Sequence, residues 1–213
     1  MGGCGAGAPM KPSGPAHFIL GTAFIAAAII CAGGSETAAT PSAPTTVSAT
    51  EQQADSDHLT ARRLVIPVQG VQAKDLTDTF IQPRDDGARV HEALDIPADR
   101  GTPVVAVEGG RIVKLFLSKP GGITLYQFDP TDQYLYFYGH LDRYADGITE
   151  GMKLTQGQTI GHVGSSGNAN PNAPHLHFAI FKLGPKQRWW QGWPINPYPV
   201  LRGSPLLDPA LRK

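Results

Sequence analysis

Short apolar runs separated by turn residues dominate the pattern of hydrophobic and polar positions between residues 64 and 201. The runs are rich in β-branched and aromatic residues, which is typical of short strands joined by turns. The predicted strands are Val104–Val107, Arg111–Leu117, Ile123–Phe128, Tyr134–Leu141, Thr159–Val163 and Leu176–Lys182. No long stretch has the 3.6-residue apolar period of a helix, and only Gly70–Phe80 indicates a short one. The pattern therefore predicts an all-β fold, an antiparallel sheet or sandwich with little helix.

The amino-terminal segment 1–32 has a different pattern, because an uncharged apolar run from Phe18 to Ala32 follows Lys11. This run is 15 residues long, and a helix needs about 20 to span a bilayer. An export signal is therefore favoured over a membrane anchor. Cys31 at the end of the run also resembles the bacterial lipobox, although Ile30 is bulkier than that pattern prefers. Each alternative places the rest of the chain outside the cytoplasm, in the periplasm or cell envelope, and two of them tether it to the membrane.

The remaining boundaries follow from composition. Residues 33–62 are rich in Ala, Thr, Ser and Pro and almost free of large apolar residues. Such a segment buries too little surface to offset the entropy lost on ordering, so a flexible linker is predicted. Residues 63–201 form the predicted folded domain, which is long enough for one core, and residues 202–213 form a tail.

Charge and cysteine content exclude several classes of protein. The 18 basic and 18 acidic residues cancel, which argues against a nucleic-acid partner. Both cysteines lie before residue 32, so the rest of the chain holds neither a disulfide scaffold nor a thiolate metal site. Five of the seven histidines fall between residues 91 and 177, and any metal chemistry would have to come from them and from carboxylates.

Two pairs of residues have spacings that suit metal binding. His175 and His177 are two apart on a predicted strand, so their side chains share a face about 7 Å apart. His91 and Asp95 are four apart, which on a straight strand is about 13 Å and too far for one ion. A bend is therefore expected between His91 and Asp95, with Asp95 opening a strand.

The third segment with a candidate site residue is the predicted strand Tyr134–Leu141, which contains His140. Strict alternation places His140 on one face of this strand together with Tyr134, Tyr136 and Tyr138. That face suits either the floor of a cleft or an ordinary solvated surface. Taken together, the three segments offer nitrogen and oxygen ligands without cysteine. Three such ligands and an open fourth position are the composition of a catalytic zinc site, whereas structural sites are closed, usually by thiolates.

The motifs His91-x-x-x-Asp95, Tyr-Gly-His140-Leu and His175-Leu-His177-Phe resemble the three signature motifs of the lysostaphin-type (LytM-like) zinc metallopeptidases. The resemblance implies that His91, Asp95 and His177 hold Zn²⁺ and that His140 and His175 are the catalytic histidines. It further implies an antiparallel fold of the LytM-like (duplicated hybrid motif) type around a narrow groove. The substrates it implies are the peptide stems and cross-links of bacterial peptidoglycan.

The expected chemistry follows from these parts. Zinc lowers the pKa of its bound water to about 7 and polarises the scissile carbonyl. His175 is expected to take the water's proton and pass it to the leaving amine, and His140 to donate to the oxyanion. The roles of the two histidines remain exchangeable. The sequence thus predicts a zinc-dependent endopeptidase acting on peptidoglycan.

One departure from the family pattern and two rival functions remain. Ala93 stands where the family usually has glycine; if the bend needs a positive φ there, alanine adds strain of about 1 kcal/mol or more.

The first rival function is a non-catalytic LytM-like activator of a cell-wall amidase, although such relatives typically lack site residues that this chain retains. The second is a peptidase acting on extracellular proteins or glycine-rich peptides. A regulatory cell-envelope protein is a further expected partner.

Three features near these motifs have two interpretations each. His162 is expected to be a turn or strand residue rather than part of the site. Trp189, Trp190, Trp193 and Tyr198 wall a groove or, as favoured here, pack the carboxy-terminal strand against the sheet. The Gly-rich and Asn-rich stretch 164–172 gates the groove or simply connects two strands.

Overall fold

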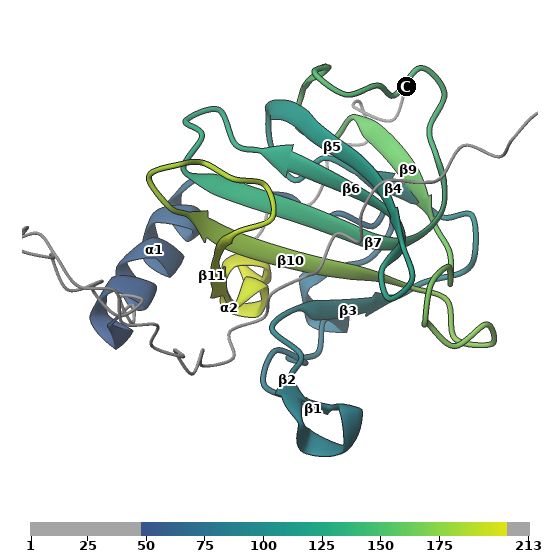
Figure 1. Ribbon diagram of the computed structural model, residues 1–213, viewed down its shortest axis with the longest axis horizontal. Helices are drawn as coiled ribbons and strands as arrows, with labels where there is room; N and C mark the ends of the chain where they lie inside the picture. Colours follow the sequence, from purple (N-terminus) through teal and green to yellow (C-terminus); the bar gives the residue numbers. More distant parts are fainter. Residues whose placement is uncertain (1–47, 204–213) are drawn as a thin grey trace, which may run out of the picture. The chain divides into compact units, whose positions relative to one another are not determined.

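A nine-stranded antiparallel sheet forms the centre of the computed structural model, which describes residues 48–203. Its main path has the order β11-β10-β7-β6-β5-β8, and β3, β4 and β9 pair off this path (Figure 1). The sheet strands are β3 (Leu94–Pro97), β4 (Pro103–Val105), β5 (Gly110–Ser118), β6 (Gly122–Phe128), β7 (Tyr134–Tyr144), β8 (Lys153–Leu154), β9 (Thr159–Val163), β10 (His175–Leu183) and β11 (Gly192–Ile195). The predicted all-β antiparallel fold is confirmed.

The remaining elements are small. A separate hairpin pairs β1 (Pro83–Arg84) with β2 (Arg89–Val90). Where a short helix was predicted within Gly70–Phe80, the structure has only the 3-10 turn η1 (Ala73–Asp75). The other helical elements of the described residues are α1 (Ala49–Ala61), η2 (Asp85–Gly87) and α2 (Pro197–Arg202).

The main core lies on one face of the sheet, and the tyrosines of β7 belong to it. Tyr134, Tyr136 and Tyr138 are each at most 1% exposed and pack with apolar residues of β10. Their face is therefore neither a cleft floor nor a solvated surface. Full burial is tolerated because the hydroxyl groups have internal partners: Tyr138 donates to Oε1 of Gln127 (2.8 Å), and Tyr136 donates to the carboxylate of Glu108.

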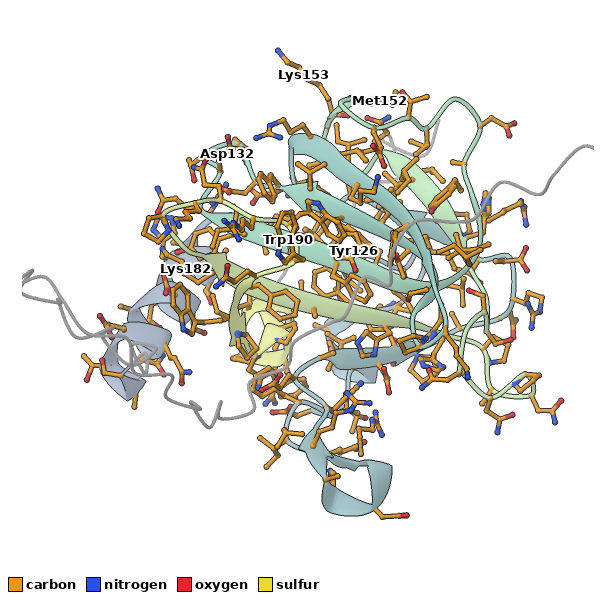
Figure 2. The ribbon with its side chains drawn as sticks, viewed as in Figure 1. Tyr126, Asp132, Met152, Lys153, Lys182 and Trp190 are labelled. Carbon is orange, nitrogen blue, oxygen red and sulfur yellow. The ribbon has the colours of Figure 1, made fainter. Side chains whose placement is uncertain are left out.

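Helix α1 lies in the segment predicted to be a flexible linker, so that prediction is wrong for residues 49–61. Ser48 and Glu51 form a capping box at its start, and Leu59 is fully buried. Asp55 accepts a hydrogen bond from Nζ of Lys182 on β10 (2.9 Å; Figure 2). A cap and a few long-range contacts therefore order a segment whose composition lacks an apolar period.

The predicted leader (1–32), the first part of the predicted linker and the chain from residue 204 onward lie outside the described residues. Within residues 48–203, no helix is long and apolar enough to cross a membrane.

Candidate metal site

The three predicted metal ligands come together at the junction of β3 and β10. The register of these strands places His177 directly opposite Asp95. Oδ1 of Asp95 lies 3.1 Å from Nε2 of His91 and 3.1 Å from Nδ1 of His177, and the two histidine nitrogens are 3.0 Å apart. One donor atom from each residue therefore converges on a single point, with all three within 4.8 Å of one another.

A sharp bend before β3 brings His91 back to Asp95, as the spacing required. The residue with positive φ in this bend is Glu92 (φ 56°), and Ala93 is not among the residues with positive φ. The condition for backbone strain at Ala93, a positive φ at that residue, is therefore not met. Hydrogen bonds hold the bend, because the His91 N–H donates to the Gln82 carbonyl (2.9 Å) and the Glu92 N–H to the Phe80 carbonyl (2.8 Å).

His140 joins the site through a bulge in β7. Tyr138 pairs with Leu125 and Leu141 with Ile123, so Gly139 and His140 of β7 together lie opposite the single residue Thr124 of β6. His140 occupies this bulge with φ 57°. The bulge breaks the predicted alternation: the tyrosines face the core, whereas the His140 ring lies 5.5 Å from the His177 ring and 5.0 Å from the His175 ring.

Backbone carbonyl groups hold the rings of His140 and His175. Nδ1 of His140 lies 2.8 Å from the Ser166 carbonyl oxygen, and Nδ1 of His175 lies 2.9 Å from that of Ala173. Since a carbonyl only accepts, Nδ1 carries the proton in each ring, and Nε2 of the neutral ring has the free lone pair. Nε2 of His175 lies 3.7 Å from Oδ1 of Asp95, beside the three converging donor atoms.

The electrostatics of the site favour an ionised Asp95 carboxylate and neutral rings at His140 and His177. Burial alone would raise the pKa of Asp95, but its interactions with the neighbouring rings of His177 and His91 outweigh burial and hold that pKa well below its ordinary value. Burial lowers the pKa of His177, and burial together with the neighbouring His177 lowers the pKa of His140 to about 4. These are the protonation states that a metal ion requires of its ligands.

The donor set fits zinc. Two imidazole nitrogens and one carboxylate oxygen are the ligands of catalytic zinc sites that keep a fourth position open. Tetrahedral zinc with bonds of about 2.05 Å has donor atoms about 3.3 Å apart. The measured separations of 3.0 to 3.1 Å need to expand by only a few tenths of an ångström.

The sequence model of Peptidase family M23 matches residues 89–197, which is about half of the chain and includes the three candidate ligands, His140 and His175. The chain belongs to Peptidase family M23.

Relatives and solved structures agree with this assignment. The chain is 36% identical over 121 residues to the L-Ala--D-Glu endopeptidase of Bacillus subtilis, covering 54% of this chain and 36% of that protein. It is 37% identical over 92 residues to lysostaphin of Staphylococcus staphylolyticus, covering 42% of this chain and 18% of that protein. The chain thus spans only about a third or less of these relatives.

Among solved structures, the catalytic domain of the prophage-encoded M23 protein EnpA from Enterococcus faecalis, solved as a point mutant, is similar with a TM-score of 0.51. The identity is 25%, and the similarity covers 64% of this chain and 95% of the EnpA domain. The antiparallel fold described above is therefore that of M23 catalytic domains.

An aromatic cluster adjoins the candidate metal site of this M23 domain on the same face of the sheet. Phe137 of β7 meets the ring of His177 edge-on at 5.7 Å and that of Tyr126 at 4.9 Å. Trp189 covers Tyr126 at 4.9 Å, as packing against the sheet predicts, whereas the neighbouring Trp190 is 55% exposed (Figure 2).

Two other predictions concern the surroundings of the site. His162 lies in β9, paired with Pro103 and Arg143, as expected of a strand residue. The stretch 164–172 is more than a connection, because its Ser166 holds His140 through the carbonyl group and also receives a hydrogen bond from the Ile123 N–H (2.9 Å).

Sequence reasoning missed two residues that contact the ligands of this M23 site. Thr79 bonds to both His91 and Asp95, and Arg84 pairs with the second oxygen of Asp95. Both lie upstream of the signature motifs, in a segment without periodicity or a recognisable motif. Only the fold brings them to the site.

Proposed function

We propose that this chain is a zinc-dependent endopeptidase that hydrolyses peptide cross-links of bacterial peptidoglycan. The observation that carries the proposal is the convergence of His91, Asp95 and His177 on one point, with the rings of His140 and His175 beside it. The names of the relatives, an L-Ala--D-Glu endopeptidase and lysostaphin, support a peptidase acting on the cell wall.

His91, Asp95 and His177 would hold the zinc ion. When bound, zinc supplies a Lewis acid that polarises the scissile carbonyl and makes water nucleophilic near neutral pH. The chain's own residues move the protons. Nε2 of His140 or of His175 can accept a proton from water, because Nδ1 of each ring is already bound to a carbonyl group.

Burial distinguishes the two histidines. Burial lowers the pKa of His140 and keeps its ring neutral, and the Ser166 carbonyl holds its Nδ1 hydrogen, so its Nε2 lone pair is free and we assign it the role of proton acceptor. His140 then passes the water's proton to the leaving amine, and His175 donates a hydrogen bond to the oxyanion, which exchanges the roles that the sequence first suggested. A donor at Nε2 of His175 is a protonated ring, since its Nδ1 hydrogen is held by the Ala173 carbonyl.

The substrate and the amino-terminal sequence both bear on where the domain acts in the cell. Peptidoglycan lies outside the cytoplasm, and the apolar pattern of residues 1–32 is typical of an export signal or membrane anchor. We therefore propose that the domain acts in the periplasm or cell envelope.

Digestion of purified peptidoglycan tests the proposal. Zinc-loaded protein should release new amino groups from the wall, and mass spectrometry of the products identifies the bond that is cut. The chelator-treated protein and an Asp95→Asn variant should release none, because each lacks the metal. Zinc-loaded protein that releases no amino groups but stimulates an added cell-wall amidase would instead indicate the activator. Cleavage of glycine-rich peptides or extracellular proteins, with intact walls left unchanged, would indicate the third function.

A further inference from the structure

Thr79 contacts two of the three candidate ligands. Its carbonyl oxygen accepts a hydrogen bond from Nδ1 of His91 (2.9 Å). Its hydroxyl group accepts from the Asp95 N–H (3.0 Å) and donates to the Ala93 carbonyl (3.2 Å). Thr79 is itself buried, so water does not compete for these bonds. Thr79 thus contacts both ends of the bend that joins His91 to Asp95, with its backbone carbonyl at His91 and its hydroxyl group at Asp95.

These hydrogen bonds determine which atoms of His91 and Asp95 are available to bind a metal and how they are oriented. A proton held at Nδ1 of His91 leaves the lone pair at Nε2, the atom that faces Asp95 and His177. The hydroxyl bridge of Thr79 fixes the backbone at Asp95 relative to Ala93. The first contact leaves Nε2 of His91 free to bind a metal, and the second orients the Asp95 carboxylate.

Arg84 acts on the other side of the same carboxylate. Its guanidinium NH2 group lies 2.6 Å from Oδ2 of Asp95, whereas Oδ1 faces the histidines. The pair is partly exposed, so its contribution to stability is small. The main consequence of the contact is that Oδ2 is occupied and Oδ1 is the oxygen left free for a metal.

We propose that Thr79 and Arg84 are positioning residues of the metal site. Thr79 fixes the tautomer of His91 and the backbone of Asp95, and Arg84 limits Asp95 to one donor oxygen. Both residues lie outside the region 89–197 that matches the family model, so this chain completes its site with a segment upstream of that region. The inference rests on metal binding in the proposed function but not on hydrolysis.

The zinc affinity of Thr79→Val, measured by competition with a chromophoric chelator, tests the first part. Valine keeps the shape and the carbonyl group but removes the hydroxyl, so zinc should bind about 10- to 100-fold more weakly. Thr79→Ser retains the hydroxyl and should stay within about threefold of the native affinity. Melting of the metal-free variants shows that both are folded at the assay temperature. A valine variant with the native affinity would overturn the role of Thr79.

The visible absorption of the Co²⁺-loaded protein tests the second part. Four-coordinate Co²⁺ absorbs more strongly than five-coordinate Co²⁺. Arg84→Gln releases Oδ2 of Asp95 and should therefore weaken the absorption. Arg111→Gln is the matched control, because it removes a partly exposed arginine–carboxylate pair with Asp132, which includes none of the candidate metal ligands. An Arg84→Gln spectrum identical to the native one would overturn the role of Arg84.

These measurements do not depend on catalysis. Native protein that binds zinc and cobalt but shows no effect of either variant contradicts this inference and leaves the proposed function standing. Native protein that binds no metal contradicts both.

Discussion

Glu92 and His140 share a left-handed backbone conformation, with φ of 56° and 57°. This conformation costs a non-glycine residue about 1 kcal/mol. In both cases it redirects the chain at the site: Glu92 turns His91 toward Asp95, and His140 leaves the core face of β7 for the face that carries His177. Strain concentrated at such positions is typical of functional sites.

Replacing Ala93 with glycine, the residue usual in the family, should destabilise this protein. Ala93 is 1% exposed and has no positive φ. The change therefore loses a buried methyl group and increases the freedom of the unfolded chain, lowering the free energy of unfolding by about 1 kcal/mol. Urea denaturation measures the difference, with exposed Ala88→Gly as the control. A more stable Ala93→Gly variant would show that the bend is strained at Ala93 after all.

The His140 imidazole should titrate near pH 4 in the metal-free protein, since burial and the neighbouring His177 lower its pKa to about 4. The unfolded state then binds the proton more readily, at a pKa of about 6.5. The contribution of His140 to stability is therefore complete above about pH 6.5 and declines as the pH falls toward 4. NMR titration of the ring protons tests this, and a midpoint near 6.5 would contradict it.

At the scale of elements, the arginine that follows α1 adds an ion-pair anchor to the contacts that Asp55 and Leu59 of the helix make. Arg62 pairs with Glu108 (2.7 Å) and with Asp129 (2.8 Å). The side chains of these two acids are 10% and 0% exposed. Removal of the arginine would leave both carboxylates without their cation.

Arg62→Gln should therefore lower the free energy of unfolding by about 3 kcal/mol, because it breaks a largely buried ion pair. The neighbouring Arg63 is exposed, so Arg63→Gln should change stability by less than about 0.5 kcal/mol. Denaturant unfolding of the two variants gives the comparison. Equal stabilities would mean that α1 is not anchored through Arg62.

The elements show what sequence patterns can and cannot predict. Five strands of the sheet follow from local β-branched and aromatic runs, so β5, β6, β7, β9 and β10 lie close to their predicted ranges, whereas no predicted range corresponds to β8 or β11. Helix α1 does not follow in this way, because its order depends on contacts with residues distant in the chain. The bulge at His140 is likewise a property of the pairing between β6 and β7, which alternation alone does not reveal.

At the scale of the whole molecule, the site joins the bend before β3, the bulge of β7 and the start of β10. The sequence motifs identified the histidines and Asp95, because the site residues within a motif lie only a few positions apart in the chain. Thr79 and Arg84 escaped prediction because their contacts span 11 to 16 positions and depend on the fold.

Because the metal would bridge these distant segments, zinc should stabilise the folded protein. At a free concentration about a thousandfold above the dissociation constant, binding adds about 4 kcal/mol to the free energy of unfolding. Thermal melting with and without zinc measures the gain, and Asp95→Asn should abolish it. A melting temperature that zinc leaves unchanged would contradict the metal site.

The most direct test of the central claim compares native protein with His140→Ala for zinc content and for release of amino groups from purified peptidoglycan. His140 is not one of the three candidate ligands, so the variant should retain one zinc ion per chain. It should lose at least about 100-fold in rate, because it lacks the proton acceptor. His162→Ala, on β9 and outside the site, should retain both properties. A His140→Ala variant with its zinc and full activity would contradict the account.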